Sequence, residues 1–250
     1  MVRFQWHVEG GHTAHVPVNG VKLLKGGIAH VELDIEMPGT PGATPKALLT
    51  MPAAAHRPGT VKSIGVVLSH DLDAAGWRGE LLTGLAEALA AEGYLVMRSH
   101  CVLKEARRLR AFEKALDAAA TSPYAIQITS WVLAGVGNGA RIAATVGMKC
   151  RGTLAGFLLL SYPLQDVPAS VKPLAAARAP MLFVHTAHDP LCSVDALRAC
   201  CAGIAHQECR VVLVPGVSAA FADASGSSAH AIRKVRVRVC VRASRHACGG

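Results

Sequence analysis

Short apolar segments alternate with amphipathic segments of helical length from Ile64 to about residue 214, and this alternation limits the folds open to the chain. The expected strands cover residues 64–69, 94–99, 131–135, 154–160, 181–185 and 210–214, and the expected helices cover 79–92, 103–120, 138–148 and 193–205. Strands connected by helices of this length pair in parallel and are covered on both faces. The sequence therefore predicts a doubly wound, mostly parallel α/β sheet with helices on both faces, whose ligands bind at the carboxyl ends of the strands.

An antiparallel hairpin is expected before this alternation. Apolar and polar residues alternate over 29–36, turn-forming residues follow at Pro38–Pro45, and a second strand is expected near Ala47–Met51. Residues 1–25 show no clear period and are left unassigned. The expected domain covers residues 26–222, with the Pro/Ala-rich stretch Pro168–Pro180 as a connection, and a basic tail covers 223–250.

Composition excludes several classes of protein. A hydrophobic fraction of 51% with only 17% charged residues excludes disorder for most of the chain. The longest apolar run, Leu154–Leu160, is far shorter than the ~20 residues of a membrane-spanning helix. The first residues lack the order of a secretory signal, so a cytoplasmic location is expected, with the nucleus as the alternative. The 8 cysteines form no C-x-x-C pair and no zinc pattern, so they are interpreted as reduced packing residues, with no metal and no cofactor.

The segment GVGNGA at Gly135–Ala140 follows an expected strand and opens an expected helix. Serine hydrolases with this kind of sheet place G-x-S-x-G there, because the sharp turn raises the serine above the sheet. In this chain Gly137 holds the position of the serine. It has no side chain that could attack a substrate.

Six sequence blocks, in order and spacing, carry a resemblance to a known family. The blocks are LSHDLDAAGW (68–77), YLVMRSHCVLKEARRLRAFEKAL (94–116), GVGNGARIAATV (135–146), LLLSYPL (158–164), PMLFVHTAHDPLC (180–192) and VVLVPGVSAAF (211–221). The chain resembles the α/β-hydrolase-like family that includes testis-expressed protein 30 and the hydrolase-like part of NSL complex subunit three, with dienelactone hydrolases as more distant relatives. This resemblance implies an α/β-hydrolase-like fold.

The resemblance also assigns catalytic positions one residue at a time. The nucleophilic serine falls on Gly137, the acid falls on Asp189, and the histidine falls approximately on Ala219. The acid alone only orients a base, so a triad reduced to Asp189 has no catalytic meaning. The oxyanion hole would consist of the Asn138 N–H and an N–H near Asp71 or Leu72.

Several other residues are candidates near the same edge of the sheet. His70, His185 and His188 are interpreted as polar groups that line the site, with a relocated base at His185 or His188 as the alternative. Cys101 is a candidate displaced nucleophile. Asn138 is interpreted first as a residue that starts a helix. Carboxylates at Asp71 and Asp73 would oppose a negative charge that develops in the oxyanion hole.

The end of the chain is strongly basic. The formal net charge is +9, and after Asp223 there are six basic residues and no acidic residue. Val235, Val237, Val239 and Val241 alternate with arginine and cysteine, which predicts a strand with one cationic face or a disordered basic tail. Such a tail could bind nucleic acid or another acidic surface. A misread intron or a shifted reading frame would equally explain the departure from the family pattern at the turn where the histidine belongs.

The sequence therefore predicts an α/β-hydrolase-fold protein with a degenerate triad, most simply a non-catalytic binding or regulatory protein. Its partner, a protein or a small ligand, is unknown. The first alternative is a serine-hydrolase-type esterase or acyl hydrolase that uses displaced residues, or whose C-terminal sequence is misrepresented. The second alternative is a nucleic-acid or acidic-surface binder that acts through the tail.

Overall fold

The computed structural model describes the chain from Gln5 to Val235 with gaps. The described residues are 5–7, 13–15, 21–24, 26–34, 46–55, 59–71, 76–101, 104–150, 154–164, 167–190, 192–204, 208–218 and 220–235. The strands are β1 (Gln5–His7), β2 (Thr13–His15), β3 (Val21–Leu24), β4 (Ile28–Asp34), β5 (Lys46–Pro52), β6 (Ile64–Ser69), β7 (Leu95–His100), β8 (Ser130–Val136), β9 (Leu154–Leu160), β10 (Met181–Thr186) and β11 (Cys209–Val214). The α-helices are α1 (Glu80–Ala91), α2 (Glu105–Thr121), α3 (Asn138–Lys149), α4 (Val167–Ala176) and α5 (Val194–Gly203).

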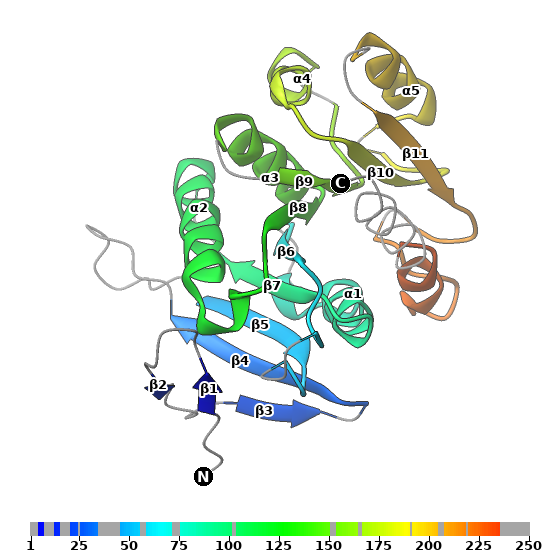
Figure 1. Cartoon of the computed structure of the whole chain (residues 1–250). Coiled ribbons are helices and arrows are strands. Elements are labelled where there is room, and N and C mark those ends of the chain that lie inside the picture. The colour runs from blue at the N-terminus through cyan, green and yellow to red at the C-terminus, as the bar shows by residue number, and fades with distance from the viewer. Residues whose placement is uncertain are drawn as a thin grey trace.

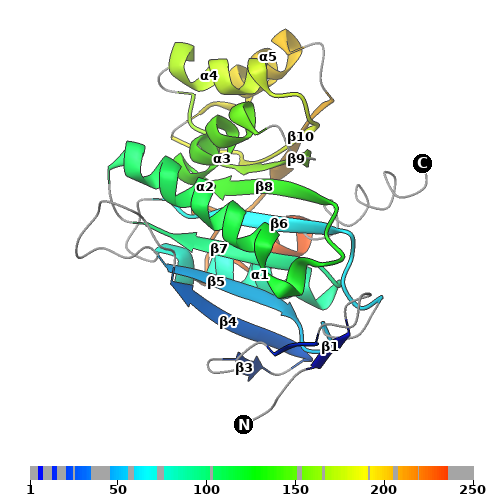
Figure 2. The ribbon, with the colours of Figure 1, turned by 60° about the vertical axis from the view of Figure 1, so that its left-hand side comes forward.

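A nine-stranded sheet organises the fold, in the order β11-β10-β9-β8-β6-β7-β5-β4-β3 (Figures 1 and 2). The six strands from β11 to β7 are parallel to their neighbours, and β5, β4 and β3 continue the sheet in antiparallel pairs. The predicted doubly wound, mostly parallel sheet is confirmed, as is the predicted hairpin, which is formed by β4 and β5. The strands β1 and β2 pair separately, in the region that the sequence left unassigned.

Two apolar layers hold helices on opposite faces of the sheet (Figure 1). On one face, Phe112 of α2, Ile142 of α3 and Leu197 of α5 are buried in a single cluster. On the other face, Leu85 and Leu89 of α1 are fully buried against β6, β7 and β8. Because the sheet is covered on both faces, its central parallel strands are largely apolar, and their ends are open to polar chemistry.

The stretch Pro168–Pro180, expected to be a connection, contains helix α4 instead. Pro173 lies inside this helix and removes one backbone hydrogen bond. Tertiary contacts offset that cost, because Leu174 is fully buried and the Tyr162 hydroxyl donates a hydrogen bond of 2.7 Å to the Ser170 carbonyl oxygen. Packing overrides the low helix propensity of proline here.

The start of the predicted basic tail also differs from the expectation. Residues 229–235 are helical, so Val235, expected to begin a strand or a disordered segment, is helical instead. Ala231 and Val235 are four residues apart and fully buried in the same cluster as Leu82 and Leu85 of α1. The burial of one helix face accounts for the helix in this segment. The alternation of valine and arginine from 235 onward had pointed to a strand instead. The rest of the alternating segment, 236–242, lies outside the described residues, and the division into domain and tail stays a prediction.

The buried side chain of Val235 allows a test of how much this helical segment contributes to stability. Val235→Ala removes two methyl groups from a fully buried site and should lower the free energy of unfolding by about 2 kcal/mol. Lys234→Ala changes the exposed neighbour and should alter that free energy by less than about 0.5 kcal/mol. Urea unfolding of both variants measures the difference. Equal stabilities would contradict the packing of residues 229–235 against α1.

Candidate functional site

The turn from β8 into α3 has the tight geometry expected of the glycine-rich segment. Gly137 precedes α3 with φ 54° and ψ −122°, in the left-handed region that favours glycine. A Cβ atom at Gly135 would lie 2.3 Å from the Gly139 carbonyl carbon, and one at Gly139 would lie 2.4 Å from the Ser69 carbonyl oxygen. The small residues therefore let β6, β8 and the start of α3 approach closely at this edge of the sheet.

The side chain of Asp71 occupies the space above Gly137. A Cβ atom at Gly137 would lie 2.0 Å from Asp71 Oδ2, far inside van der Waals contact. Asp71 Oδ1 accepts hydrogen bonds from the backbone N–H of Asn138 at 3.2 Å and from its side-chain Nδ2 at 3.1 Å. A carboxylate at a helix N-terminus is stabilised by the exposed N–H groups there. The amide that would stabilise a substrate oxyanion is thus already bonded to an anion of the chain itself.

The side chain and backbone of His70 form hydrogen bonds that hold the loop containing Asp71. Its Nε2 accepts a hydrogen bond of 3.2 Å from the Cys101 N–H, so the ring proton resides on Nδ1, which donates to the Asp71 carbonyl oxygen. The Arg108 guanidinium donates to the His70 carbonyl oxygen. Burial lowers the pKa of Arg108, and the charge of Asp71 partly offsets this effect. These contacts make His70 and Arg108 supports that position Asp71.

An aromatic stack extends this support. The ring of His100 lies between those of His70 and Trp77, with centroid separations of 5.3 and 5.2 Å. Burial lowers the pKa of His100, and the charges of Arg78 and Lys46 lower it further. An uncharged His100 can stack without the cost of burying a cation.

Asp189 follows β10 and forms a buried pair with His185. Asp189 Oδ2 lies 3.6 Å from His185 Nδ1. The other ring nitrogen of His185, Nε2, donates a hydrogen bond of 2.6 Å to the Cys192 carbonyl oxygen. His185 is fully buried and bonded on that side to the backbone, so it is not oriented to accept a proton from a substrate. His188 is exposed on the turn that follows β10.

A cavity of about 460 Å³ lies at the carboxyl ends of the central strands. Asp71, Val136, Ser161 and Asp189 line it, and these residues end or follow β6, β8, β9 and β10 respectively. Its other described lining residues are Gly76, Gly79, Glu80, Leu81, Leu82, Pro190, Ala220, Ala222, Gly226 and Ser228. The structure thus brings the predicted oxyanion loop, the acid position and the neighbours of the predicted histidine position to one cavity. Ala219 and Leu72 themselves lie outside the described residues.

Two contributors to this cavity were missed from the sequence. Glu80 Oε1 accepts hydrogen bonds of 2.8 Å from the Ser228 N–H and 3.1 Å from the Ser227 hydroxyl, which ties the C-terminal segment to α1. Ser161 is buried with φ 45°, an unusual backbone conformation for serine. Glu80 lies in the first turn of a helix and Ser161 follows an apolar strand. Neither position carries a sequence signal that would place the residue at this cavity.

The cavity combines acidic and apolar groups. Its three carboxylates, from Asp71, Glu80 and Asp189, are accompanied by no lysine, arginine or histidine among the described lining residues. Two serines, Ser161 and Ser228, are also among the described lining residues. The arrangement suits noncovalent binding of an apolar molecule that carries no negative charge.

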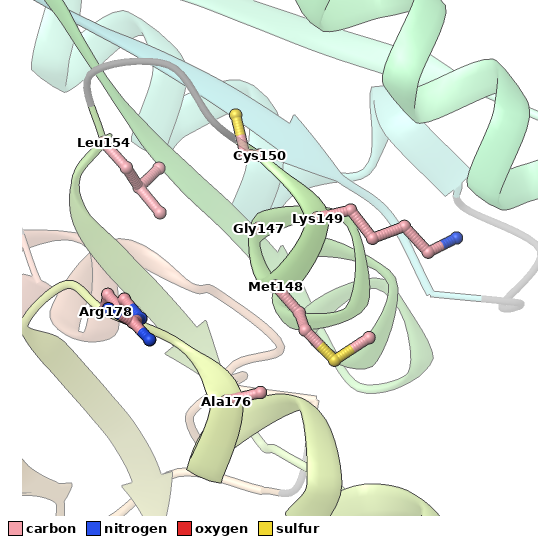
Figure 3. A pocket seen from close by; sticks show the side chains of 7 residues that line it. All are labelled: Gly147, Met148, Lys149, Cys150, Leu154, Ala176 and Arg178. Carbon is pink, nitrogen blue, oxygen red and sulfur yellow. The ribbon is translucent and has the colours of Figure 1, made fainter.

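A second cavity, of about 680 Å³, lies beside the end of α3 and the start of β9, away from the carboxyl ends of the strands (Figure 3). The end of α4 and the residues after it complete the wall. The described lining residues are Gly147, Met148, Lys149, Cys150, Leu154, Ala176 and Arg178. Figure 3 shows the Lys149 side chain pointing away from Arg178, so the two cations do not converge on one ligand position. None of the predicted site residues lies there.

The described residues contain no group of three or more His, Cys, Asp or Glu side chains placed to hold a metal ion. No helix within the described part of the chain has both the length and the apolar character needed to cross a bilayer.

Comparison with known proteins places the fold. No protein-family model and no curated protein matches the chain. Solved structures do match: Est1E from Butyrivibrio proteoclasticus is 14% identical with a TM-score of 0.67, covering 85% of this chain and 99% of its own. An alpha-beta serine hydrolase homologue from Coxiella burnetii is 19% identical with a TM-score of 0.65, covering 83% and 96%. A dienelactone hydrolase from Anabaena variabilis is 13% identical with a TM-score of 0.64, covering 84% and 96%. The chain has an α/β-hydrolase-like fold, as the sequence predicted.

A double-mutant cycle tests whether Asp71 fills the space above Gly137. Gly137→Ala should lower the free energy of unfolding by about 3 kcal/mol, because the methyl group displaces Asp71 from Asn138 and the residue keeps a left-handed backbone. In an Asp71→Ala background the same change should cost only about 1 kcal/mol. The coupling energy of about 2 kcal/mol is measured by urea unfolding of the four proteins.

The control cycle pairs Gly137→Ala with Asp117→Ala, since Asp117 is an exposed carboxylate on α2. These two changes should add within about 0.5 kcal/mol. A coupling energy near zero in the Asp71 cycle as well would show that Asp71 does not occupy the space above Gly137.

Proposed function

We propose that this chain is a non-catalytic α/β-hydrolase-fold protein that binds a small ligand at the carboxyl ends of its central strands. One observation carries the proposal: the Asp71 carboxylate fills the space above Gly137 and bonds the first amide of α3. A serine hydrolase needs that space for its nucleophile and that amide for the oxyanion. In this chain the Asp71 carboxylate occupies that space and accepts the hydrogen bond of that amide, so it would prevent acyl transfer at this position.

The rest of the triad supports the same interpretation. Asp189, at the acid position, is paired with His185, whose second nitrogen is bonded to the Cys192 carbonyl oxygen. The His185 ring is therefore unavailable as a relocated base. Cys101, the candidate displaced nucleophile, is buried, and its N–H donates to His70. It is not among the described residues that line the cavity.

The lining of the cavity favours a particular class of ligand. Leu81, Leu82, Val136 and Pro190 supply apolar surface, and the three carboxylates supply negative charge. A carboxylate ligand would be repelled by these charges, whereas an amine would be attracted. The proposed ligand is therefore a small apolar molecule that is neutral or cationic.

The lack of hydrolase chemistry can be tested with active-site probes. The unmodified chain should not react with a fluorophosphonate probe, and its turnover of p-nitrophenyl esters should not exceed the residual ~10³–10⁴ over water that remains without a triad. Asp71→Ala combined with Gly137→Ser and Ala219→His should give labelling at residue 137, because the nucleophile, its base and the space for the substrate are then all present. Labelling is measured by mass spectrometry of the modified peptide.

The matched control keeps Asp71 and carries only Gly137→Ser and Ala219→His. It should remain unlabelled, since Asp71 still occupies the space around residue 137 and its amide donor. Labelling of the unmodified chain at any serine or cysteine would instead establish the displaced-nucleophile esterase.

Ligand preference is tested with three probes of similar size: benzylamine, benzyl alcohol and benzoate. Benzylamine should bind at least about tenfold more tightly than benzoate, as measured by calorimetry at neutral pH and low salt, because three carboxylates line the cavity. Ala222→Phe should fill the cavity and abolish binding, whereas Ala120→Phe, an exposed change on α2, should not alter it. Preferential binding of benzoate, or binding that survives Ala222→Phe, would contradict the proposed site.

A further inference from the structure

The lining of the 460 Å³ cavity comes from two parts of the chain. One part is the carboxyl edge of the sheet with the start of α1, and it includes Val136 and Glu80. The other part is the C-terminal segment 222–228, which we call the cover. Its lining residues are Ala222, Gly226 and Ser228. In Figure 1 this part of the chain is orange and follows β11. A ligand in the cavity would therefore touch both parts.

The cover has little apolar packing of its own. Phe221 before it and Ala231 after it are fully buried in the apolar cluster that contains Leu82 of α1. Between these two residues the chain carries only alanine, aspartate, serine, glycine and histidine, and residues 224–226 are exposed. A segment with few buried apolar contacts opens locally at a lower free energy than the whole protein unfolds.

Hydrogen bonds within the cover hold its shape. Asp223 Oδ1 accepts hydrogen bonds from the Ser225 N–H at 2.9 Å, the Ser225 hydroxyl at 2.6 Å and the Ser227 N–H at 3.1 Å. The Asp223 N–H donates to the Ser227 carbonyl oxygen, and the Gly226 N–H donates to the Asp223 carbonyl oxygen, both at 2.9 Å. Because donors and acceptors all belong to the cover, these bonds do not depend on where the cover lies relative to α1.

Glu80 joins the cover to α1. Its Oε1 accepts hydrogen bonds from the Ser228 N–H at 2.8 Å and from the Ser227 hydroxyl at 3.1 Å. Hydrogen bonds to an ionised carboxylate are stronger than those between neutral groups. Glu80 also lines the cavity, so the residue that holds the cover belongs to the ligand site itself.

We propose that residues 222–228 are a movable cover that Glu80 holds closed over the cavity, and that a ligand enters and leaves when this contact opens. The inference rests on the ligand site proposed above. Opening breaks the two hydrogen bonds to Glu80, whereas the bonds around Asp223 are kept. A bound ligand touches both parts of the lining and therefore stabilises the closed position.

Amide hydrogen exchange of the full chain, followed residue by residue by nuclear magnetic resonance, tests the closure without any ligand. In the unmodified chain the Ser228 N–H should exchange faster than the Leu85 N–H in the buried middle of α1. Glu80→Ala removes both acceptor contacts and should accelerate exchange of the Ser228 N–H at least about tenfold. Glu80→Gln is the matched control, because it removes the same charge but keeps an acceptor oxygen, and it should restore most of the protection.

Two other amides serve as references within the same samples. The Ser227 N–H, which is held by Asp223 inside the cover, should change by less than about twofold in Glu80→Ala. Unchanged exchange of the Leu85 N–H verifies that the variants keep their global stability. The proposal would be overturned if the Ser228 N–H exchanged as slowly as the Leu85 N–H, or if Glu80→Ala left it unaffected. Equal acceleration of Ser227 and Ser228 would overturn movement of the cover as a unit.

Benzylamine then tests the connection to the ligand. At a concentration ten times its Kd, a ligand that binds only the closed form should slow exchange of the Ser228 N–H about tenfold. Calorimetry on the same sample shows whether benzylamine binds. Binding without slower exchange would overturn the role of the cover in ligand entry. No binding would instead contradict the proposed ligand site, while exchange in the two Glu80 variants still decides whether Glu80 holds the cover.

Discussion

The contact between the Asp71 carboxylate and the start of α3 determines the character of the candidate site. Asp71 Oδ1 accepts two hydrogen bonds from Asn138, one of them from the backbone N–H at the positive end of the helix. Hydrogen bonds to a charged group contribute about 1.5–3 kcal/mol each. Only glycine at position 137 leaves room for this carboxylate, since a Cβ atom there would overlap it. Gly137 and Asp71 are therefore two parts of a single arrangement.

This arrangement reverses the electrostatics of a hydrolase site. An oxyanion hole is a set of N–H donors that face an open position, where negative charge develops during the reaction. Here the carboxylate of Asp71 belongs to the protein, and it accepts the hydrogen bond of the Asn138 N–H before any ligand enters. Glu80 and Asp189 add further carboxylates to the same cavity. Three carboxylates therefore line a cavity at the place where an oxyanion hole would need hydrogen-bond donors.

The sequence predicts the sheet well because burial on both faces makes the parallel strands largely apolar runs. The helices between them keep their apolar residues three and four positions apart. Two α-helical segments of the described residues were not foreseen. Prolines made α4 hard to predict, and its packing includes the buried Leu174. The alternation of valine and arginine hid the helical segment 229–235. In the site, the glycine at position 137 of the turn into α3 was visible from one motif. The position of Asp71 over that glycine was not, because it depends on a loop held by His70 and Arg108.

The presence of an aspartate at the acid position has an explanation that needs no catalysis. Asp189 is buried, and a buried carboxylate without a partner costs several kcal/mol. His185 lies 3.6 Å away, and its Nε2–H is held by the Cys192 carbonyl oxygen, so Nδ1 is directed toward Asp189. Removing either partner would take this contact away from a buried polar group. The pair joins the end of β10 to the loop that follows it, and Asp189 lines the cavity at that point.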